Sequence, residues 1–126
     1  MQKIKCGIDI VEIERIEKSI TRTNGKFIEE VYTQKEIEYC ESKKNAKYQH
    51  YAVRFAAKEA IFKAISDFLT NKYEISWQNI QILNNEQGRP YIEFINTRFD
   101  QIKSIDISLS HCKQYAIANV ALIYEE

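Results

Sequence analysis

The chain has 126 residues, of which 44% are hydrophobic and 29% charged, with three Gly and one Pro. Enough apolar side chains are present to offset the entropy of ordering, which excludes a disordered chain, and the length predicts one domain, 1–126. The 18 basic and 18 acidic residues cancel. Bulk charge therefore predicts no nucleic-acid partner, and an anionic ligand must meet a local patch of charge.

No stretch approaches the ~20 consecutive apolar residues that a membrane-spanning helix needs, so we expect no membrane partner. No signal-peptide core follows Met1. The three cysteines, Cys6, Cys40 and Cys112, are odd in number and far apart. They form neither a disulfide framework nor a metal-binding pair, which favours reduced thiols and a cytoplasmic location.

The first predicted elements are a strand over 4–11 and a helix over 12–22. In the strand, isoleucines alternate with other residues, so Asp9 points away from the isoleucine face, which we expect to be buried. At about 100° per residue, the apolar side of the helix lies opposite a basic stripe. That stripe consists of Arg15, Lys18 and Arg22.

Two further helical segments follow the turn at Asn24-Gly25. Residues 27–32 have the pattern of a helical turn. Thr33 and Glu36 have the spacing of a capping box, in which each side chain satisfies the other's free backbone N–H. We expect the box to begin a helix that runs to about Lys43.

The longest periodic segment, 48–69, predicts a helix with two apolar arcs on opposite sides. One arc consists mostly of alanines, and the other is rich in aromatic side chains. Such a helix is buried between two layers. Its charges fall into the two seams between the arcs, Arg54 with Lys58 in one and Glu59 with Lys63 in the other.

The rest of the chain reads mainly as strands: 75–83, 91–95, 105–111 and 115–124, with a hairpin turn over 84–90, a short helix over 97–103 and a turn over 112–114. The simplest arrangement of these elements is an α+β domain, in which the helices lie on one side of an antiparallel sheet.

Glu59 and Lys63 are the first candidates for chemistry. At a spacing of four residues they could form an ordinary surface ion pair. This helix has almost no exposed face, however, and buried charges are costly unless they have partners. An anion and a cation brought to the seam would supply them. Asp9 alone could cap a strand end, but with Glu59 it indicates a hard-cation site of the kind that holds Mg²⁺.

The segment 108–113 (SLSHCK) concentrates hydrogen-bond donors where a strand ends. His111 could be a structural residue, or it could contact a phosphate together with its neighbours. A Cys112–His111 nucleophile pair is disfavoured, because adjacent strand residues point to opposite faces. Arg89, in the hairpin turn, is a candidate ligand-facing charge.

Four segments together resemble the holo-acyl-carrier-protein synthases, a family of 4′-phosphopantetheinyl transferases. Residues 7–16 (GIDIVEIERI) resemble the family's opening motif, and 54–64 (RFAAKEAIFKA) its central helix signature. Residues 88–90 (GRP) match its turn, and 107–116 (ISLSHCKQYA) its final segment. The order of these motifs, the spacing between them and the length of the chain agree with the family over essentially the whole chain.

The resemblance implies transfer of 4′-phosphopantetheine from coenzyme A to a serine of apo-acyl carrier protein, with Mg²⁺ required, adenosine 3′,5′-bisphosphate released, and a role in fatty acid biosynthesis. It implies that Asp9 and Glu59 ligate Mg²⁺ and that Lys63 holds the diphosphate. It further implies that Arg54 and His111 reach the 3′-phosphate, with Lys58 nearby. Asp9 or a metal-bound water would accept the serine proton.

Family resemblance also implies a homotrimer with sites between subunits, and a carrier-protein docking surface that includes Arg15. The basic stripe with Lys18 and Arg22 suits an acidic partner. Unlike many relatives, this chain has no glycine just after Lys63, so the helix is expected to run longer. Two alternatives stay open: a module that binds coenzyme A or carrier protein without turnover, and a structural trimer whose seam charges pair with one another.

Overall fold

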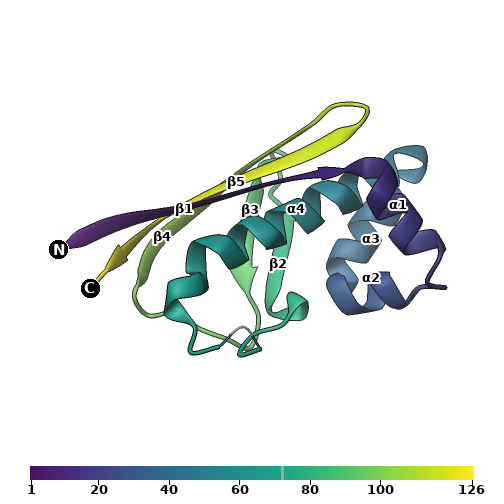
Figure 1. Ribbon diagram of the computed structural model, residues 1–126. Coiled ribbons are helices and arrows are strands. Elements are labelled where there is room, and N and C mark those ends of the chain that lie inside the picture. The colour runs from purple at the N-terminus through teal and green to yellow at the C-terminus, as the bar shows by residue number, and fades with distance from the viewer. Residues whose placement is uncertain (72) are drawn as a thin grey trace.

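A computed structural model describes residues 1–71 and 73–126. Two antiparallel sheets and one long helix organise the chain (Figure 1). The larger sheet has the order β1-β5-β4, formed by Gln2–Glu12, Tyr115–Glu125 and Ile102–His111. The smaller sheet pairs β2 (Ile80–Asn84) with β3 (Pro90–Phe94). These elements confirm the α+β prediction.

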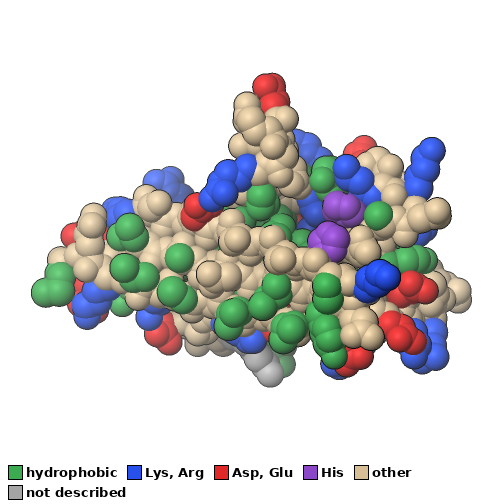
Figure 2. Space-filling model, turned by 90° about the horizontal axis from the view of Figure 1, so that it is seen from above, with side chains coloured by type: hydrophobic (Ala, Val, Ile, Leu, Met, Phe, Trp, Pro, Cys, Tyr) green, Lys and Arg blue, Asp and Glu red, His purple; other side chains and the backbone are tan. Residues whose placement is uncertain are grey.

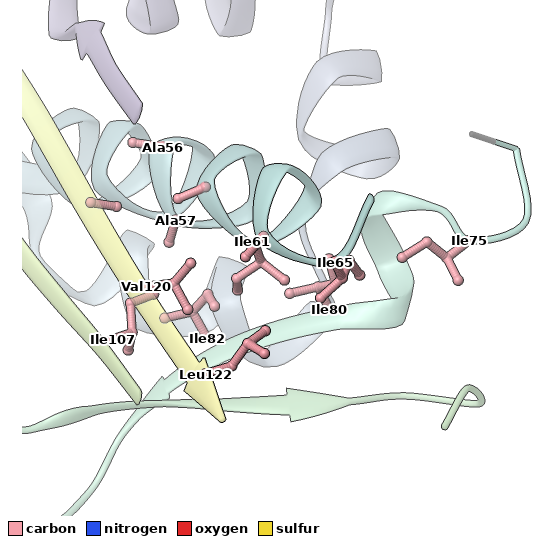
Figure 3. Close-up of a cluster of buried hydrophobic side chains, with 13 residues drawn as sticks. Ala56, Ala57, Ile61, Ile65, Ile75, Ile80, Ile82, Ile107, Val120 and Leu122 are labelled. Carbon is pink, nitrogen blue, oxygen red and sulfur yellow. The ribbon is translucent and has the colours of Figure 1, made fainter. Parts of the chain in front are cut away.

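Helix α4 (Lys47–Ile65) lies beneath the larger sheet and next to the β2–β3 hairpin (Figure 1). Ala56, Ala57, Ala60 and Ala64, which form most of its small-residue side, are fully or almost fully buried. Figure 3 shows side chains of α4 meeting Ile80 and Ile82 of β2 and Val120 and Leu122 of β5. The prediction of a helix buried between two layers is thus confirmed.

Gly7 of β1 permits the close approach of this strand to α4. A Cβ atom at position 7 would lie 1.9 Å from the carbonyl oxygen of Ala60, a distance that no packed structure tolerates. The side of β1 that carries Gly7, Asp9 and Val11 therefore faces the helix, where small side chains meet small side chains.

The expectation that the isoleucine face of β1 is buried was wrong for the isolated chain. Ile4, Ile8 and Ile10 are 71%, 56% and 59% exposed. The alternation was correctly identified, but the glycine decides which side meets the helix. The isoleucines lie on the outer face of the sheet, where Ile4 is registered with Ile123 and Ile10 with Ile117 of β5.

Three short helices pack around the first half of α4 (Figure 1): α1 (Ile13–Thr21), α2 (Lys26–Val31) and α3 (Gln34–Ser42). The capping box is present, with the Thr33 hydroxyl accepting from the Glu36 backbone and the Glu36 carboxylate accepting from the Thr33 backbone. A 3₁₀ turn, Lys44–Ala46, joins α3 to α4.

Three boundaries differ from the expectations. The long helix ends at Ile65 and continues only as the 3₁₀ turn Ser66–Phe68. Another 3₁₀ turn, Trp77–Asn79, precedes β2, because Ser76 and Asn79 form a capping box there. Residues 97–103 form no helix. Phe99 instead packs against Phe94, and the strand β4 begins at Ile102.

No helix among residues 1–71 and 73–126 combines the length and the apolar character that crossing a membrane requires.

Candidate functional site

Asp9 of β1 and Glu59 of α4 lie on the two elements that approach each other closely at Gly7 and Ala60. The Asp9 side chain is 16% exposed, and Glu59 is half-buried. Burial raises the pKa of Glu59, the Asp9 carboxylate raises it further, and Lys63 opposes both effects. Repulsion of this kind requires the two carboxylates to lie near each other. The carboxylates of Asp9 and Glu59, the two groups predicted to bind a metal, therefore lie within electrostatic range of each other, and Lys63 hydrogen-bonds to Asp9.

Lys63 completes this cluster, which we call the carboxylate cluster: Asp9, Glu59 and Lys63. The Lys63 ammonium donates to Oδ1 of Asp9 at 3.0 Å and to the carbonyl oxygen of Ile8 at 2.9 Å. Its side chain is 55% exposed, so the lysine can leave Asp9 for a ligand phosphate without first being uncovered.

The carboxylate cluster borders a pocket of about 760 Å³. Glu59 lines this pocket together with Phe62 and Trp77, whose rings pack edge to face at 5.2 Å. Leu69 and Ile75 add further apolar wall. Sequence reasoning missed this lining, because Trp77 and Leu69 lie in segments that were expected to be a strand and a helix.

A second pocket, of about 370 Å³, carries the phosphate-binding candidates. We call it the basic pocket, and its polar lining comes from five elements or turns. The lining of the basic pocket includes Tyr39, His50, Arg54, Arg89 and His111. Figure 2 shows the two histidines side by side on the upper surface, with Lys and Arg side chains close by.

Arg54 is held rigidly at the base of the basic pocket. Its side chain is almost fully buried, its Nε donates to the carbonyl oxygen of Ile82 at 3.2 Å, and its Nη2 donates to Asn84. The guanidinium carbon lies 4.3 Å from the ring centre of Tyr39. Arg89 reaches the same pocket from the hairpin turn, where it pairs with Asp106 at 2.6 Å.

Lys58 requires a correction. It was predicted near a cofactor phosphate, but its side chain is 0% exposed. All three N–H donors of its ammonium are used, by Glu36 at 2.7 Å and by the carbonyl oxygens of Val31 and Trp77. Burial lowers the pKa of Lys58, and Glu36 counteracts that effect. The lysine joins α3 to α4 and has no donor left for a ligand.

The carboxylate cluster and the basic pocket are separate in one chain. Arg54 and Glu59 are five residues apart, which places them about 140° apart around α4. Glu59 lines the first pocket, whereas Arg54 and His111 line the second. A single chain thus carries two parts of the predicted site on different sides of one helix.

His50 was not predicted as a site residue. It precedes Arg54 by four residues on α4, which puts the two side chains on the same helix face. That spacing, together with the presence of only two histidines in the chain, is the signal that could have identified it.

The basic stripe on α1 lies on the surface. Arg15, Lys18 and Arg22 are exposed, while Ile13, Ile16 and Ile20 are buried beneath them. Lys18 pairs with Glu14 at 3.1 Å on the same helix. The predicted amphipathic pattern is confirmed.

Fewer than three His, Cys, Asp or Glu side chains converge at any one point of the described chain in a way that could hold a metal. The two carboxylates of the cluster still suit Mg²⁺, which is commonly held by one or two carboxylates while water and substrate phosphates fill the remaining positions.

Residues 5–120 match the 4′-phosphopantetheinyl transferase superfamily, so the chain belongs to that family. Among its relatives are holo-[acyl-carrier-protein] synthases. The one from Ruminiclostridium cellulolyticum is 44% identical over 117 residues, covering 89% of this chain and 86% of the relative. The one from Chloroherpeton thalassium is 40% identical, covering 94% and 97%.

Solved structures agree with this assignment. The Bacillus anthracis holo-(acyl-carrier-protein) synthase, in complex with CoA (3′,5′-ADP), has a TM-score of 0.81 at 30% identity and covers 99% of this chain and 100% of that one. The Helicobacter pylori holo-[acyl-carrier-protein] synthase, in complex with coenzyme A, has a TM-score of 0.81 at 35% identity, covering 93% and 98%. The similarity extends over the whole fold.

Proposed function

We propose that this protein is a holo-acyl-carrier-protein synthase. It transfers 4′-phosphopantetheine from coenzyme A to a serine of apo-acyl carrier protein, releases adenosine 3′,5′-bisphosphate, and thereby supports fatty acid biosynthesis. One observation carries the proposal: in a chain of this family, Asp9, Glu59 and Lys63 converge beside an open pocket. Reduced cysteines favour a cytoplasmic location for this activity.

Asp9 and Glu59 would hold Mg²⁺, which when bound supplies positive charge to the diphosphate oxygens of coenzyme A. The structure supports this assignment through the raised pKa of Glu59, because two neighbouring carboxylates of which one is half-buried leave an unbalanced negative charge. A divalent cation balances that charge.

Lys63 would move from Asp9 to the diphosphate. Phosphoryl-type transfer depends on in-line placement and on charge neutralisation more than on a strong nucleophile. A lysine that is held near the carboxylates but still 55% exposed can stabilise the negative charge on the leaving adenosine 3′,5′-bisphosphate. Asp9, close by, orients that lysine before the substrate arrives.

Arg54, Arg89 and His111 would bind the 3′-phosphate of coenzyme A in the basic pocket. The buried guanidinium of Arg54 is fixed by Ile82 and Asn84, so it offers its remaining N–H donors without first becoming ordered. A planar guanidinium suits phosphate geometry well.

The chain would act as a homotrimer with sites between subunits. Two observations support this. The two parts of the site lie in different pockets of one chain, so a carboxylate cluster from one copy and a basic pocket from another would form a complete site. The outer face of the larger sheet also exposes apolar side chains, as Figure 2 shows, and such a surface is typical of an interface.

Arg15, Lys18 and Arg22 would dock the acyl carrier protein. They are exposed on the outer side of α1, and complementary charge guides an acidic partner into the correct orientation.

The test is a mass measurement on apo-acyl carrier protein incubated with coenzyme A, Mg²⁺ and this protein. We expect a gain equal to the phosphopantetheine group, lost with EDTA and with Glu59→Ala. The control variant Lys35→Ala, at an exposed position outside both pockets, should give the same gain in mass as wild type. If coenzyme A binds but the carrier protein gains no mass, the protein is a binding module and the proposal fails.

A further inference from the structure

His50 contributes an imidazole to the basic pocket for which the proposed function has no role. It lies in the first turn of α4 and is half-buried. Its ring meets the ring of Tyr39 edge to face, with centres 5.5 Å apart, and the ring of His111 with centres 6.3 Å apart. The same pocket is lined by Arg54 and Arg89.

Both imidazoles are available for a ligand. Within residues 1–71 and 73–126, neither ring donates a hydrogen bond to a protein acceptor. An N–H donor lies about 2.8 Å from a phosphate oxygen. Two rings with centres 6.3 Å apart can therefore donate to different oxygens of one phosphate group placed between them.

The charges around His50 fit this use. It faces Arg54 on its own helix, Lys43 at the end of α3, His111 on β4 and the ring of Tyr39. Burial, followed by the effect of Arg54, Lys43 and His111, lowers the pKa of His50 to about 4. With this pKa the imidazole is uncharged at neutral pH, so it keeps one N–H donor without repelling Arg54.

We propose that His50 and His111 together contact the phosphate monoester of coenzyme A, and that His50 makes this pocket distinguish coenzyme A from 3′-dephospho-coenzyme A. The inference rests on the proposed function, which puts coenzyme A at this site. Arg54 and Arg89 supply positive charge to the pocket. Each of the two imidazoles donates along a fixed N–H axis, so the imidazoles determine the orientation of the bound phosphate.

Binding should also change the protonation of His50. Without ligand, the pKa of the imidazole is low because the ring is partly buried and because its neighbours Arg54, Lys43 and His111 are cationic or can become so. A phosphate dianion reverses the local field, so the pKa of His50 rises when the phosphate binds. A purely structural histidine, packed between Tyr39 and His111, would not respond to the presence or absence of one phosphate group on the ligand.

The experiment compares wild type with His50→Phe by isothermal titration calorimetry, using coenzyme A and 3′-dephospho-coenzyme A, each with Mg²⁺. Phenylalanine keeps an aromatic ring against Tyr39 and His111 but has no N–H donor. We expect the preference for coenzyme A to fall about tenfold, the value of one hydrogen bond to a charged group, with unchanged affinity for the dephospho form. Gln49→Ala, on the same helical turn but outside the pocket, should match wild type.

Three outcomes overturn the inference. If His50→Phe keeps the wild-type preference, His50 does not contact the phosphate, while the proposed function stands. If the variant loses affinity equally for both ligands, His50 acts only through the shape of the pocket. If wild type binds neither ligand and transfers nothing to the carrier protein, the proposed function fails as well.

Proton NMR provides an independent readout on folded protein. The chain has only two histidines, so the spectrum of His50→Phe assigns both imidazole signals. We expect the titration midpoint of His50 to rise by at least about one pH unit when coenzyme A is bound, which corresponds to a tenfold effect, and to stay unchanged with the dephospho form. An equal midpoint with both ligands contradicts the proposed contact.

Discussion

Gly7 controls the geometry of the carboxylate cluster although it carries no functional group. It lies two residues before Asp9 on β1, and a side chain there would collide with the backbone of Ala60, next to Glu59 on α4. The glycine therefore sets how closely the strand that carries one carboxylate approaches the helix that carries the other.

Replacing Gly7 by alanine should destabilise the protein by about 3 kcal/mol, because strand and helix must separate and leave imperfect packing. The separation should also weaken the effect of Mg²⁺ on stability. Thermal unfolding with and without Mg²⁺ measures both effects. Cys6→Ala, at an exposed position on the same strand, serves as the control and should change stability little. A Gly7→Ala protein with wild-type stability would contradict the clash.

The Glu59→Gln variant should change the pH dependence of stability in the metal-free protein, and it should also lose the response to Mg²⁺. The pKa of Glu59 is raised in the folded state, so the folded protein binds more protons than the unfolded one just above pH 4.5, and stability falls as pH rises through that window. We expect the glutamine variant to lose this dependence and to be slightly more stable than wild type at neutral pH without metal.

With Mg²⁺ present, wild type should be more stable than Glu59→Gln. A ligand that binds only the native state stabilises it, by about 2.7 kcal/mol at a concentration 100 times its Kd. Thermal unfolding at pH 7 should show this increase for wild type and none for Glu59→Gln. If Mg²⁺ stabilises both proteins equally, Glu59 is not a metal ligand.

At the scale of secondary structure, α3 is tied to the rest of the fold by one buried ion pair. Glu36 caps its own helix, pairs with Lys58 of α4 at 2.7 Å, and accepts from the backbone N–H of Ile82 on β2 at 2.7 Å. A single carboxylate thus connects three elements, in a region where both charged side chains have 0% exposure.

Glu36→Gln should cost about 3–5 kcal/mol, because it leaves the Lys58 charge buried without its partner. Urea unfolding measures the loss. The double variant Glu36→Gln with Lys58→Met removes both charges and should recover part of the stability. A double variant less stable than Glu36→Gln alone would show that Lys58 contributes mainly through its bonds to the Val31 and Trp77 carbonyls.

At the scale of the whole molecule, the outer face of the larger sheet exposes several large apolar side chains. β1 and β5 place Ile4, Ile8, Ile10 and Ile123 there, and Figure 2 views this face from above. We expect Ile8→Glu to keep the monomer folded but to abolish self-association, because a charge in an apolar interface must be desolvated.

Light scattering coupled to size exclusion checks this prediction. Wild type should have three times the mass of the chain and Ile8→Glu the mass of one chain, with at least a hundredfold loss of transfer activity if sites lie between subunits. Glu38→Lys, exposed on α3, is the control and should remain associated and active. A fully active monomer would disprove the shared site.

Local patterns in the sequence determined much of this protein. The amphipathic α1, the capping box at Thr33 and Glu36, the doubly apolar α4 and the β4–β5 hairpin all follow from side-chain periodicity and backbone capping, which act between near neighbours. The residues that meet in the carboxylate cluster were identified from their charge in otherwise apolar segments.

Three features could be established only from the folded chain: which face of β1 is covered, which groups pair with Lys58, and that the ring of His50 lies beside that of His111. Each depends on a contact between residues far apart in the chain: Gly7 against Ala60, Lys58 against Glu36, His50 against a strand end some sixty residues later. Periodicity indicates that a side chain should be buried or that a charged group needs a partner. The identity of the residue that covers the side chain or pairs with the charge depends on how closely two backbone segments can approach. That distance is set by the packing of the whole chain.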